Sequence, residues 1–233
     1  MPKRAGRHPL HDVRGVPSAL TAETDIVGIG GSVTPASLLA GYAMGIFPMA
    51  IEIAERGSAV GWYAPAERAV LRPPGMHISR SLRRSMRHFA ITYDTAFGAV
   101  VAGCADPARD HGWITPEYRD AYERLHRAGH AHSVEVWQAG ELVGGLIGIE
   151  LGGLFCADSK FRRVTDASKA AVAGLSWLMF AGEAGQHRMV DAQWMTGHLA
   201  SLGFQTIPGE RYARLVPELG AVPGAFAGGR STT

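Results

Sequence analysis

The amino-acid sequence predicts an α+β fold whose larger part has a mainly antiparallel central sheet. The main evidence is a meander between residues 132 and 157, in which apolar stretches are separated by glycine-containing turns at 139–140 and 151–153. Helical patterns lie before and after this meander. The chain has 233 residues, of which 46% are hydrophobic, so it is long enough to bury a sizeable core.

The first part of the chain predicts a small unit of one helix and several short strands. Residues 1–25 show little periodicity, and we expect them to be irregular. Thr34 is a suitable N-cap, Pro35 suits a first helical turn, and Gly45 can end the helix that they begin. The stretch 51–75 mixes short apolar segments with Gly and Pro, which predicts strands and turns.

A larger unit is expected to follow the turn sequence Pro73-Pro74-Gly75, so that residues 1–72 form a small N-terminal α/β domain and residues 73–233 a second domain. Caps, periodicity and turn residues then predict the elements of the second domain. These are a short basic helix at 77–89, an amphipathic helix at 118–130, a helix at 166–181 with Asp166 as its N-cap, a strand around Asp191, a helix at 197–203 and a strand at 204–207.

Charge and cysteine content exclude several classes of protein. Charged residues make up 19% of the chain and the formal net charge is +2, so any contact with nucleic acid must come from a local basic patch. Cys104 and Cys156 form no C-x-x-C motif, which favours a reduced compartment. Neither a signal-peptide pattern nor a long apolar run occurs, so we expect a soluble cytoplasmic protein without membrane contact.

Several residues that could carry chemistry also have a structural interpretation. His130 and His132 form an H-x-H pair without a further ligand cluster nearby, which favours a structural role, and we expect no metal site. Ser133 lies in no G-x-S-x-G motif, so a serine hydrolase is a poor interpretation. Cys156 could be a nucleophile, but packing as a small hydrophobic residue is the better interpretation.

The basic helix at 77–89 carries arginines at helical spacing. Arg80, Arg83 and Arg87 share one face of the predicted helix, and Arg84 lies beside them. The pattern fits either a solvated surface or a stripe that binds phosphate groups.

The stretch RMVDAQWMTGHLASLGF, from Arg188 to Phe204, contains an unusual strand. Asp191 and Gln193 interrupt an otherwise apolar segment. Strand residues two apart point to the same face, so we expect the carboxylate and the carboxamide to point to one place. From these residues alone, the pair either belongs to a reaction site or satisfies buried backbone N–H groups.

Long motifs run along the chain from about Leu38 to Arg214. They are LLAGYAMGIFPMA, HISRSLRR, WITPEYRDAYERLHRAGHAHSVEVW, ELVGGLIG, LFCADSKF, DASKAA and VDAQWMTGHLASLGF. In their order and spacing they resemble the leucyl/phenylalanyl-tRNA–protein transferase family. The resemblance implies a GNAT-like acyltransferase domain after the small N-terminal domain. It also implies transfer of Leu or Phe, and less well Met, from aminoacyl-tRNA to a protein with an N-terminal Arg or Lys, which marks that protein for degradation.

The implied reaction converts an activated ester into an amide, which is downhill and requires no ATP, metal or other cofactor. Its barrier comes from positioning, from deprotonating the α-amine and from stabilising the oxyanion. The resemblance makes Asp191 and Gln193 the catalytic pair, with Asp191 polarising the attacking amine directly or through Gln193. In a rival account the ribose hydroxyl of the tRNA transfers the proton and Asp191 only orients groups.

The resemblance also implies a set of binding residues and a monomeric enzyme. Positions around the terminal adenosine and the aminoacyl amine match Tyr42, Trp113, Phe155 and Asp158. The apolar cup for the donor side chain matches Leu146, Phe155, Leu175, Met179 and Val190. The basic cluster that meets the tRNA acceptor stem matches Arg80, Arg83 and Arg84.

Three residues depart from the family pattern at the expected site. The chain has FCADSKF where the family has F-C/F-G-E-S-M-F, so Ala157 replaces Gly, Asp158 replaces Glu and Lys160 replaces Met. Burying an unpaired ammonium group is costly. We therefore expect Lys160 either to turn outward and pair with a carboxylate such as Asp158, or to make the cup accept a smaller or more polar side chain.

Two other functions stay open because of these departures. One is a related aminoacyl-tRNA-dependent enzyme that acylates a small-molecule amine in natural-product biosynthesis. The other is a catalytically inactive module that binds tRNA. The presence of both Asp191 and Gln193 argues against the inactive module.

Overall fold

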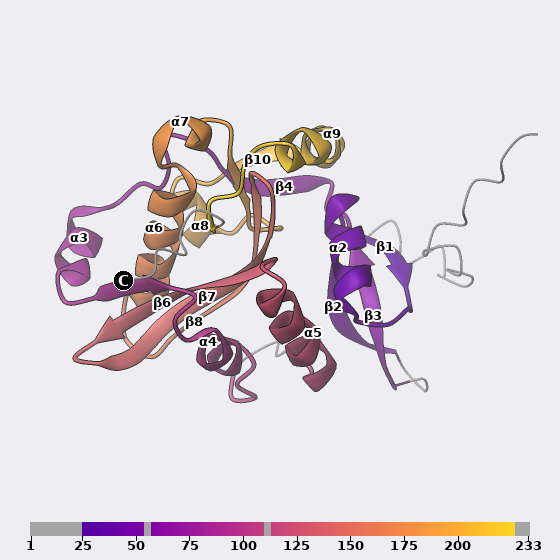
Figure 1. Ribbon diagram of the computed structural model, residues 1–233, viewed down its shortest axis with the longest axis horizontal. Coiled ribbons are helices and arrows are strands. Elements are labelled where there is room, and N and C mark those ends of the chain that lie inside the picture. The colour runs from indigo at the N-terminus through magenta and orange to yellow at the C-terminus, as the bar shows by residue number, and fades with distance from the viewer. Residues whose placement is uncertain (1–24, 54–56, 110–112, 227–233) are drawn as a thin grey trace, which may run out of the picture.

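The computed structural model describes residues 25–53, 57–109 and 113–226. Its strands form a small three-stranded sheet and a larger seven-stranded sheet, with most helices gathered around the larger one (Figure 1). One pair of neighbouring strands is parallel and the other pairs are antiparallel, which confirms the predicted α+β fold with a mainly antiparallel sheet. The expectation for residues 1–24 lies outside the described part of the chain.

The small sheet carries one helix, as the sequence predicts. Its strands are, in spatial order, β1 (Ile26–Ile29), β3 (Gly57–Tyr63) and β2 (Phe47–Ile53), and its helix is α2 (Pro35–Ala43). Thr34 caps α2, because its side chain accepts from the Ser37 N–H at 3.1 Å. Gly45 follows the helix with a φ of 78°, so both predicted ends are confirmed. A Cβ on Gly41 would lie 2.4 Å from the Trp62 ring, so glycine lets α2 pack closely on β3.

The large sheet has the predicted meander at its centre. Its strands are, in spatial order, β10 (Gln205–Pro208), β4 (Glu67–Leu71), β9 (Met189–Asp191), β8 (Leu154–Arg162), β7 (Glu141–Leu151), β6 (Ala131–Gln138) and β5 (Ala90–Tyr93). β8 pairs in parallel with β9 over residues 154–156 alone, so within the described chain the second half of β8 has no partner on that side. β4 precedes the predicted boundary yet lies in this sheet, and the division at residue 72 stays a prediction.

Helices cover both faces of the central strands. They are α3 (Arg80–Met86), α4 (Phe97–Cys104), α5 (Pro116–Arg127), α6 (Ala167–Met179), α7 (Gly182–Gly185), α8 (Gly197–Ser201) and α9 (Gly209–Gly220). α4 and α5 lie on one side of the β6–β7–β8 meander and α6 lies on the other (Figure 1), which divides the buried apolar residues into two clusters. Among the described residues, no helix has the length and apolar character needed to cross a membrane.

Two local predictions need correction. Asp166 holds the N-cap position of α6, as predicted, but its backbone is left-handed, with a φ of 67°, and its carboxylate accepts from Lys169 and Ser85 and makes no capping bond to the helix. β9 ends at Asp191, and Gln193 has a φ of 60°, which no strand residue has. The two side chains therefore do not share one face of a strand.

A β-bulge in β8 isolates one acidic residue from the regular ladder. In the pairing of β7 with β8, Ile147 lies opposite Ser159 and Gly148 lies opposite Ala157, so Asp158 is the extra residue. A bulge of this kind bends the strand and redirects a side chain. The bulge therefore turns Asp158 out of the strand's regular alternation of faces.

Gly148→Ala should destabilise the protein by roughly 1–3 kcal/mol. The added Cβ would lie 2.2 Å from the Cys156 carbonyl oxygen and 2.4 Å from the Phe155 ring, so backbone must move. Urea unfolding measures the effect. Gly98→Ala on α4 is the matched control, because nothing lies within 4 Å of its added Cβ, and the protein should become no less stable. Equal unfolding midpoints for the two variants would contradict this account of the bulge.

Candidate active site

Asp158 is the point at which four parts of the chain meet. The Tyr42 hydroxyl, from α2, donates to one carboxylate oxygen at 2.8 Å, and the Tyr122 hydroxyl, from α5, donates to the other at 2.7 Å. The Gln193 side-chain amide, which follows β9, donates to Asp158 at 3.1 Å. The small N-terminal unit and the large sheet therefore contribute to one site.

The environment of Asp158 makes its carboxyl group a weaker acid than an ordinary aspartic acid. Burial raises the pKa of Asp158 to about 7, and the charge of Asp191 acts in the same direction. Hydrogen bonds from Tyr122 and Tyr42 lower this pKa but do not offset the loss of solvation. Burial also raises the pKa of both tyrosines, which keeps them neutral donors. Near neutral pH, Asp158 is thus suited to take up and return a proton.

Asp191 lies deeper and is held by Arg68. Both residues are at most 1% exposed. The Arg68 Nε donates to one oxygen of Asp191 at 3.1 Å and its Nη2 donates to the other oxygen. The Tyr212 hydroxyl at 3.1 Å and the Gln193 backbone N–H at 3.0 Å complete the set of donors. The carboxylate of Asp191 therefore faces protein donors on all sides instead of a cavity.

The Arg68 side chain is fixed as firmly as its partner. Its Nη1 donates to the Gly45 carbonyl oxygen at 3.0 Å. The guanidinium carbon lies 4.1 Å from the centroid of the Tyr212 ring and 4.9 Å from that of Phe47, which are cation–π distances. Arg68 thus links the loop after α2 to the centre of the large sheet.

Gln193 connects the two carboxylates in series. Its backbone N–H binds Asp191 and its side-chain amide binds Asp158. Its left-handed backbone allows the two groups to point in different directions. The structure therefore brings together the pair predicted from the sequence, Asp191 and Gln193, but as successive links instead of two groups on one face.

A small apolar cavity of about 90 Å³ opens beside Asp158. Its apolar lining consists of Leu146, Ala157, Val172, Leu175, Val190, Ala192, Leu199 and Phe204. A cavity needs only about 10–15 Å³ of such space to hold one water molecule, so this one has room for several non-hydrogen atoms of a side chain. Of the residues predicted for a donor cup, Leu146, Leu175 and Val190 line the cavity. Phe155 and Met179 are fully buried and are not part of its lining.

Lys160 lines the same cavity. Within the described chain it has no carboxylate within salt-bridge distance, so the pairing with Asp158 that the sequence suggested is not formed. Burial lowers the pKa of the Lys160 ammonium group. The cup is therefore an apolar pocket with a cation in its wall.

The other predicted residues lie away from this cavity. Trp113 is half-buried and packs edge-on against Tyr118, with ring centroids 5.1 Å apart. Arg80, Arg83 and Arg84 are exposed on α3. No ion pair involves these arginines in the part of the chain that the structure describes.

Sequence reasoning missed three residues of this site. Tyr122 was expected only in the apolar face of a helix, where its hydroxyl has no predicted partner. Arg68 follows Glu67 at the start of β4, before the apolar residues of that strand, so no signal in the sequence indicates that its charge points inward. Tyr212 on α9 gave no such signal either, because only the fold brings it to Asp191.

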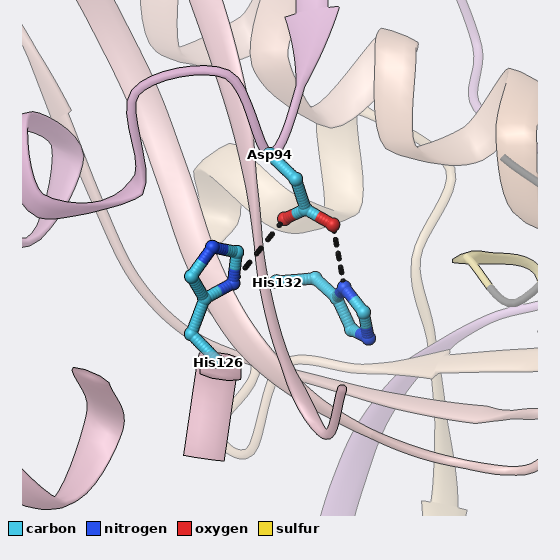
Figure 2. A group of neighbouring side chains, drawn as sticks. All are labelled: Asp94, His126 and His132. Atoms are coloured by element: carbon cyan, nitrogen blue, oxygen red, sulfur yellow. Dashed lines mark hydrogen bonds and ion pairs between the residues drawn. The ribbon is translucent and has the colours of Figure 1, made fainter. Parts of the chain in front are cut away.

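A second polar cluster, Asp94 with His126 and His132, lies elsewhere in the large domain (Figure 2). The Nδ1 of His132 is 2.7 Å from Asp94, but the Nδ1 of His126 is 2.9 Å from the Ala131 carbonyl oxygen. A carbonyl oxygen only accepts, so this His126 nitrogen carries its proton and has no lone pair for a metal. The His132 ring stacks on Phe226 at 4.2 Å, which supports a structural role for it.

An apolar cup beside a carboxyl group of near-neutral pKa can hold an apolar group next to a proton acceptor, as a group-transfer enzyme requires, and comparison with known proteins gives the particular family. The family model described as leucyl/phenylalanyl-tRNA protein transferase matches residues 70–217, and the model of its N-terminal domain matches residues 31–66. The chain belongs to the leucyl/phenylalanyl-tRNA–protein transferase family, as its motifs predicted.

Individual relatives agree with this assignment. The leucyl/phenylalanyl-tRNA–protein transferase of Edwardsiella ictaluri is 44% identical over 88% of this chain and 83% of its own length. That of Escherichia coli O1:K1 is 40% identical over 89% of this chain and 88% of its own length. A GCN5-related N-acetyltransferase-like protein from Streptococcus suis matches 74% of this chain and 64% of its own at 14% identity, with a TM-score of 0.35. A structural likeness this loose supports no argument.

Asp191→Ala should destabilise the protein by about 3–5 kcal/mol, because it leaves the Arg68 charge buried and unpaired. Urea unfolding measures the loss. In the double variant Arg68→Met with Asp191→Leu, no buried charge is left, so it should be more stable than Asp191→Ala alone. A double variant less stable than the single one would show that hydrogen bonds to Gly45 and Tyr212, not the unpaired charge, dominate.

Asp158→Asn should change how stability depends on pH. Because the folded state raises the pKa of Asp158 from 3.8 to about 7, it favours the protonated form. The contribution of Asp158 to stability is therefore full below about pH 4 and is lost as pH rises towards and through 7. Unfolding free energies measured from pH 4 to 8 should fall more steeply for the wild type than for Asp158→Asn. Parallel curves would show that Asp158 titrates normally.

Proposed function

We propose that this protein transfers Leu or Phe, and less well Met, from aminoacyl-tRNA to the α-amine of proteins that begin with Arg or Lys, marking them for degradation. It acts as a cytoplasmic monomer. The observation that carries the proposal is the apolar cup with Asp158 and Gln193 in its lining, in a chain of this family. An apolar side chain in the cup would hold its ester next to a proton acceptor.

The proposed reaction needs one proton transfer on each side of the ester. The acceptor α-amine nitrogen attacks the ester carbonyl carbon, the C–N bond forms, and the bond to the ribose oxygen breaks. An α-amine has a pKa of about 7.7–8.0, so at neutral pH a fraction of it has already given its ammonium proton to solvent and is uncharged. As the C–N bond forms, the nitrogen of this uncharged amine gives one further proton to the Asp158 carboxylate. The ribose oxygen leaves with a proton, which Asp158 returns directly or through the adjacent hydroxyl of the ribose.

Asp191 then acts as a positioning residue in this proposal. Its carboxylate accepts hydrogen bonds from Arg68, Tyr212 and the Gln193 backbone. This supports the account in which Asp191 orients neighbouring groups and does not itself transfer a proton. Gln193, which Asp191 holds in place, in turn positions Asp158 through the hydrogen bond from its side-chain amide. Tyr42 and Tyr122 hold the other side of the Asp158 carboxyl group.

The proposed tRNA contact uses the exposed arginines of α3. Arg80, Arg83 and Arg84 have no ion-pair partner in the described residues, so their charges are available to acceptor-stem phosphates. Such contacts position a nucleic acid without reading its sequence.

A transfer assay tests the proposal directly. Labelled Leu-, Phe- and Met-tRNA are offered in turn with a peptide that begins with Arg and with a matched peptide that begins with Ser. Label should enter only the Arg peptide, at its α-amine, and Asp158→Asn should lower the rate by ~10²–10⁴-fold. Transfer to small amines alone would instead support an enzyme of natural-product biosynthesis. Transfer to neither would overturn the proposal.

Lys160 should broaden the choice of donor. Lys160 is one of the residues that line the cup, so Lys160→Met should favour Leu and Phe over more polar or smaller donors. A pocket change of about this size alters discrimination by roughly 10–200-fold. Leu-, Phe- and Met-tRNA in competition with Ala- and Gln-tRNA, a smaller and a more polar donor, measure the effect. Combining Lys160→Met with Asp158→Glu should strengthen the same shift, and an unchanged, strongly Leu/Phe-selective profile in all three proteins would place Lys160 outside donor recognition.

A further inference from the structure

A second cavity, of about 670 Å³, lies where β8 ends and α6 begins. The basic residues of its lining are Arg109, Lys160, Arg162, Arg163, Lys169 and His198. The acidic residues of the lining are Asp106 and Asp166, and Asp166 already pairs with Lys169 at 2.8 Å. Cations therefore outnumber anions in this cavity.

Several of these charges have no counterion of their own. Within the described chain, neither Lys160 nor Arg162 has an acidic group in salt-bridge distance. Arg109 donates to the carbonyl oxygens of Cys104 and Lys160, which fixes its side chain without neutralising it. The pKa of His198 is lowered by burial and by the nearby cations, which agrees with a positive potential in the cavity. A concave cationic surface of this kind, partly open to solvent, suits an anionic ligand.

This cationic cavity adjoins the apolar cup at one residue. Lys160 lines both cavities. In the ladder of β7 with β8, Lys160 lies opposite Leu146 and Arg162 lies opposite Gly144, so the two cations share one face of β8. Two residues along a strand cover about 7 Å. The lining thus changes from apolar to cationic within one short step along β8.

We infer that the cationic cavity binds the phosphate groups at the 3′ end of the aminoacyl-tRNA, beginning with the 5′ phosphate of the terminal nucleotide. The inference rests on the proposed function, because it takes the donor to be an aminoacyl ester of a nucleotide. In such a donor the ester joins an apolar side chain on one side to a ribose and its phosphate on the other. A donor whose side chain fills the cup therefore brings its phosphate to Lys160 and Arg162.

The arginines of α3 serve a different part of the substrate in this arrangement. Arg80, Arg83 and Arg84 would meet the acceptor stem, whereas the cationic cavity takes the single-stranded end. A donor that lacks the stem but keeps one phosphate isolates the cavity from α3.

Two minimal donors test the inference, the phenylalanyl esters of adenosine and of adenosine 5′-monophosphate, each with the Arg-starting peptide. The wild type should use the phosphorylated ester with a kcat/KM about 10–100-fold higher, as expected for charge-assisted hydrogen bonds to one phosphate. Arg162→Gln should bring this ratio towards one while changing use of the adenosine ester little. Added salt should also lower the ratio. Arg127→Gln, an exposed charge removed from α5, is the matched control and should keep the wild-type ratio.

If the small esters are poor donors, adenosine and adenosine 5′-monophosphate can instead be compared as inhibitors of transfer from charged tRNA. The ratio of their inhibition constants then replaces the ratio of kcat/KM values. A wild-type ratio near one by either measurement, or a ratio that Arg162→Gln leaves unchanged, would overturn the inference. Inorganic pyrophosphate that binds the cavity without slowing transfer would also overturn it, by assigning the cavity to a separate ligand. Absence of transfer from every donor, charged tRNA included, would count against the proposed function instead.

Discussion

The buried ion pair of Arg68 and Asp191 is the interaction on which the rest of the site depends. It joins β4 to β9, and both side chains also form hydrogen bonds with other parts of the chain. Gly45, after α2, accepts from Arg68, and Tyr212, on α9, donates to Asp191. A buried pair is tolerated only when such partners are in place. The small unit, the large sheet and the last helix are therefore held in one arrangement.

Gln193 connects the Arg68–Asp191 ion pair to Asp158. Because the Gln193 backbone is bound to Asp191, its amide is held against Asp158. The negative charge of Asp191 also contributes to the raised pKa of Asp158, although burial contributes more. Geometry and acidity at Asp158 thus depend on a group that itself faces no cavity. In the proposed mechanism the two carboxylates have different roles: Asp191 fixes positions, and Asp158 exchanges a proton.

The sequence predicted most of the regular elements, because their signals are local. Thr34 has its hydrogen-bonding partner three residues away, and the alternation within the meander repeats every two residues. The site was predicted less completely, because its geometry depends on contacts that local patterns do not encode. Asp191 and Gln193 were selected as a pair, but the left-handed turn at Gln193 breaks the alternation on which their expected geometry rested. Arg68 is 123 residues from Asp191 in the chain, and the residues around Arg68 give no indication that Asp191 is its partner.

The site includes a left-handed backbone at Gln193, a conformation that lowers the stability of the fold. A side chain with a Cβ in the left-handed region is disfavoured by roughly 1–2 kcal/mol, and glycine would remove that penalty. Glycine would also remove the only amide that reaches Asp158 among the described residues. The left-handed turn and the hydrogen bond to Asp158 therefore come from the same residue, and no single substitution relieves the one while it keeps the other.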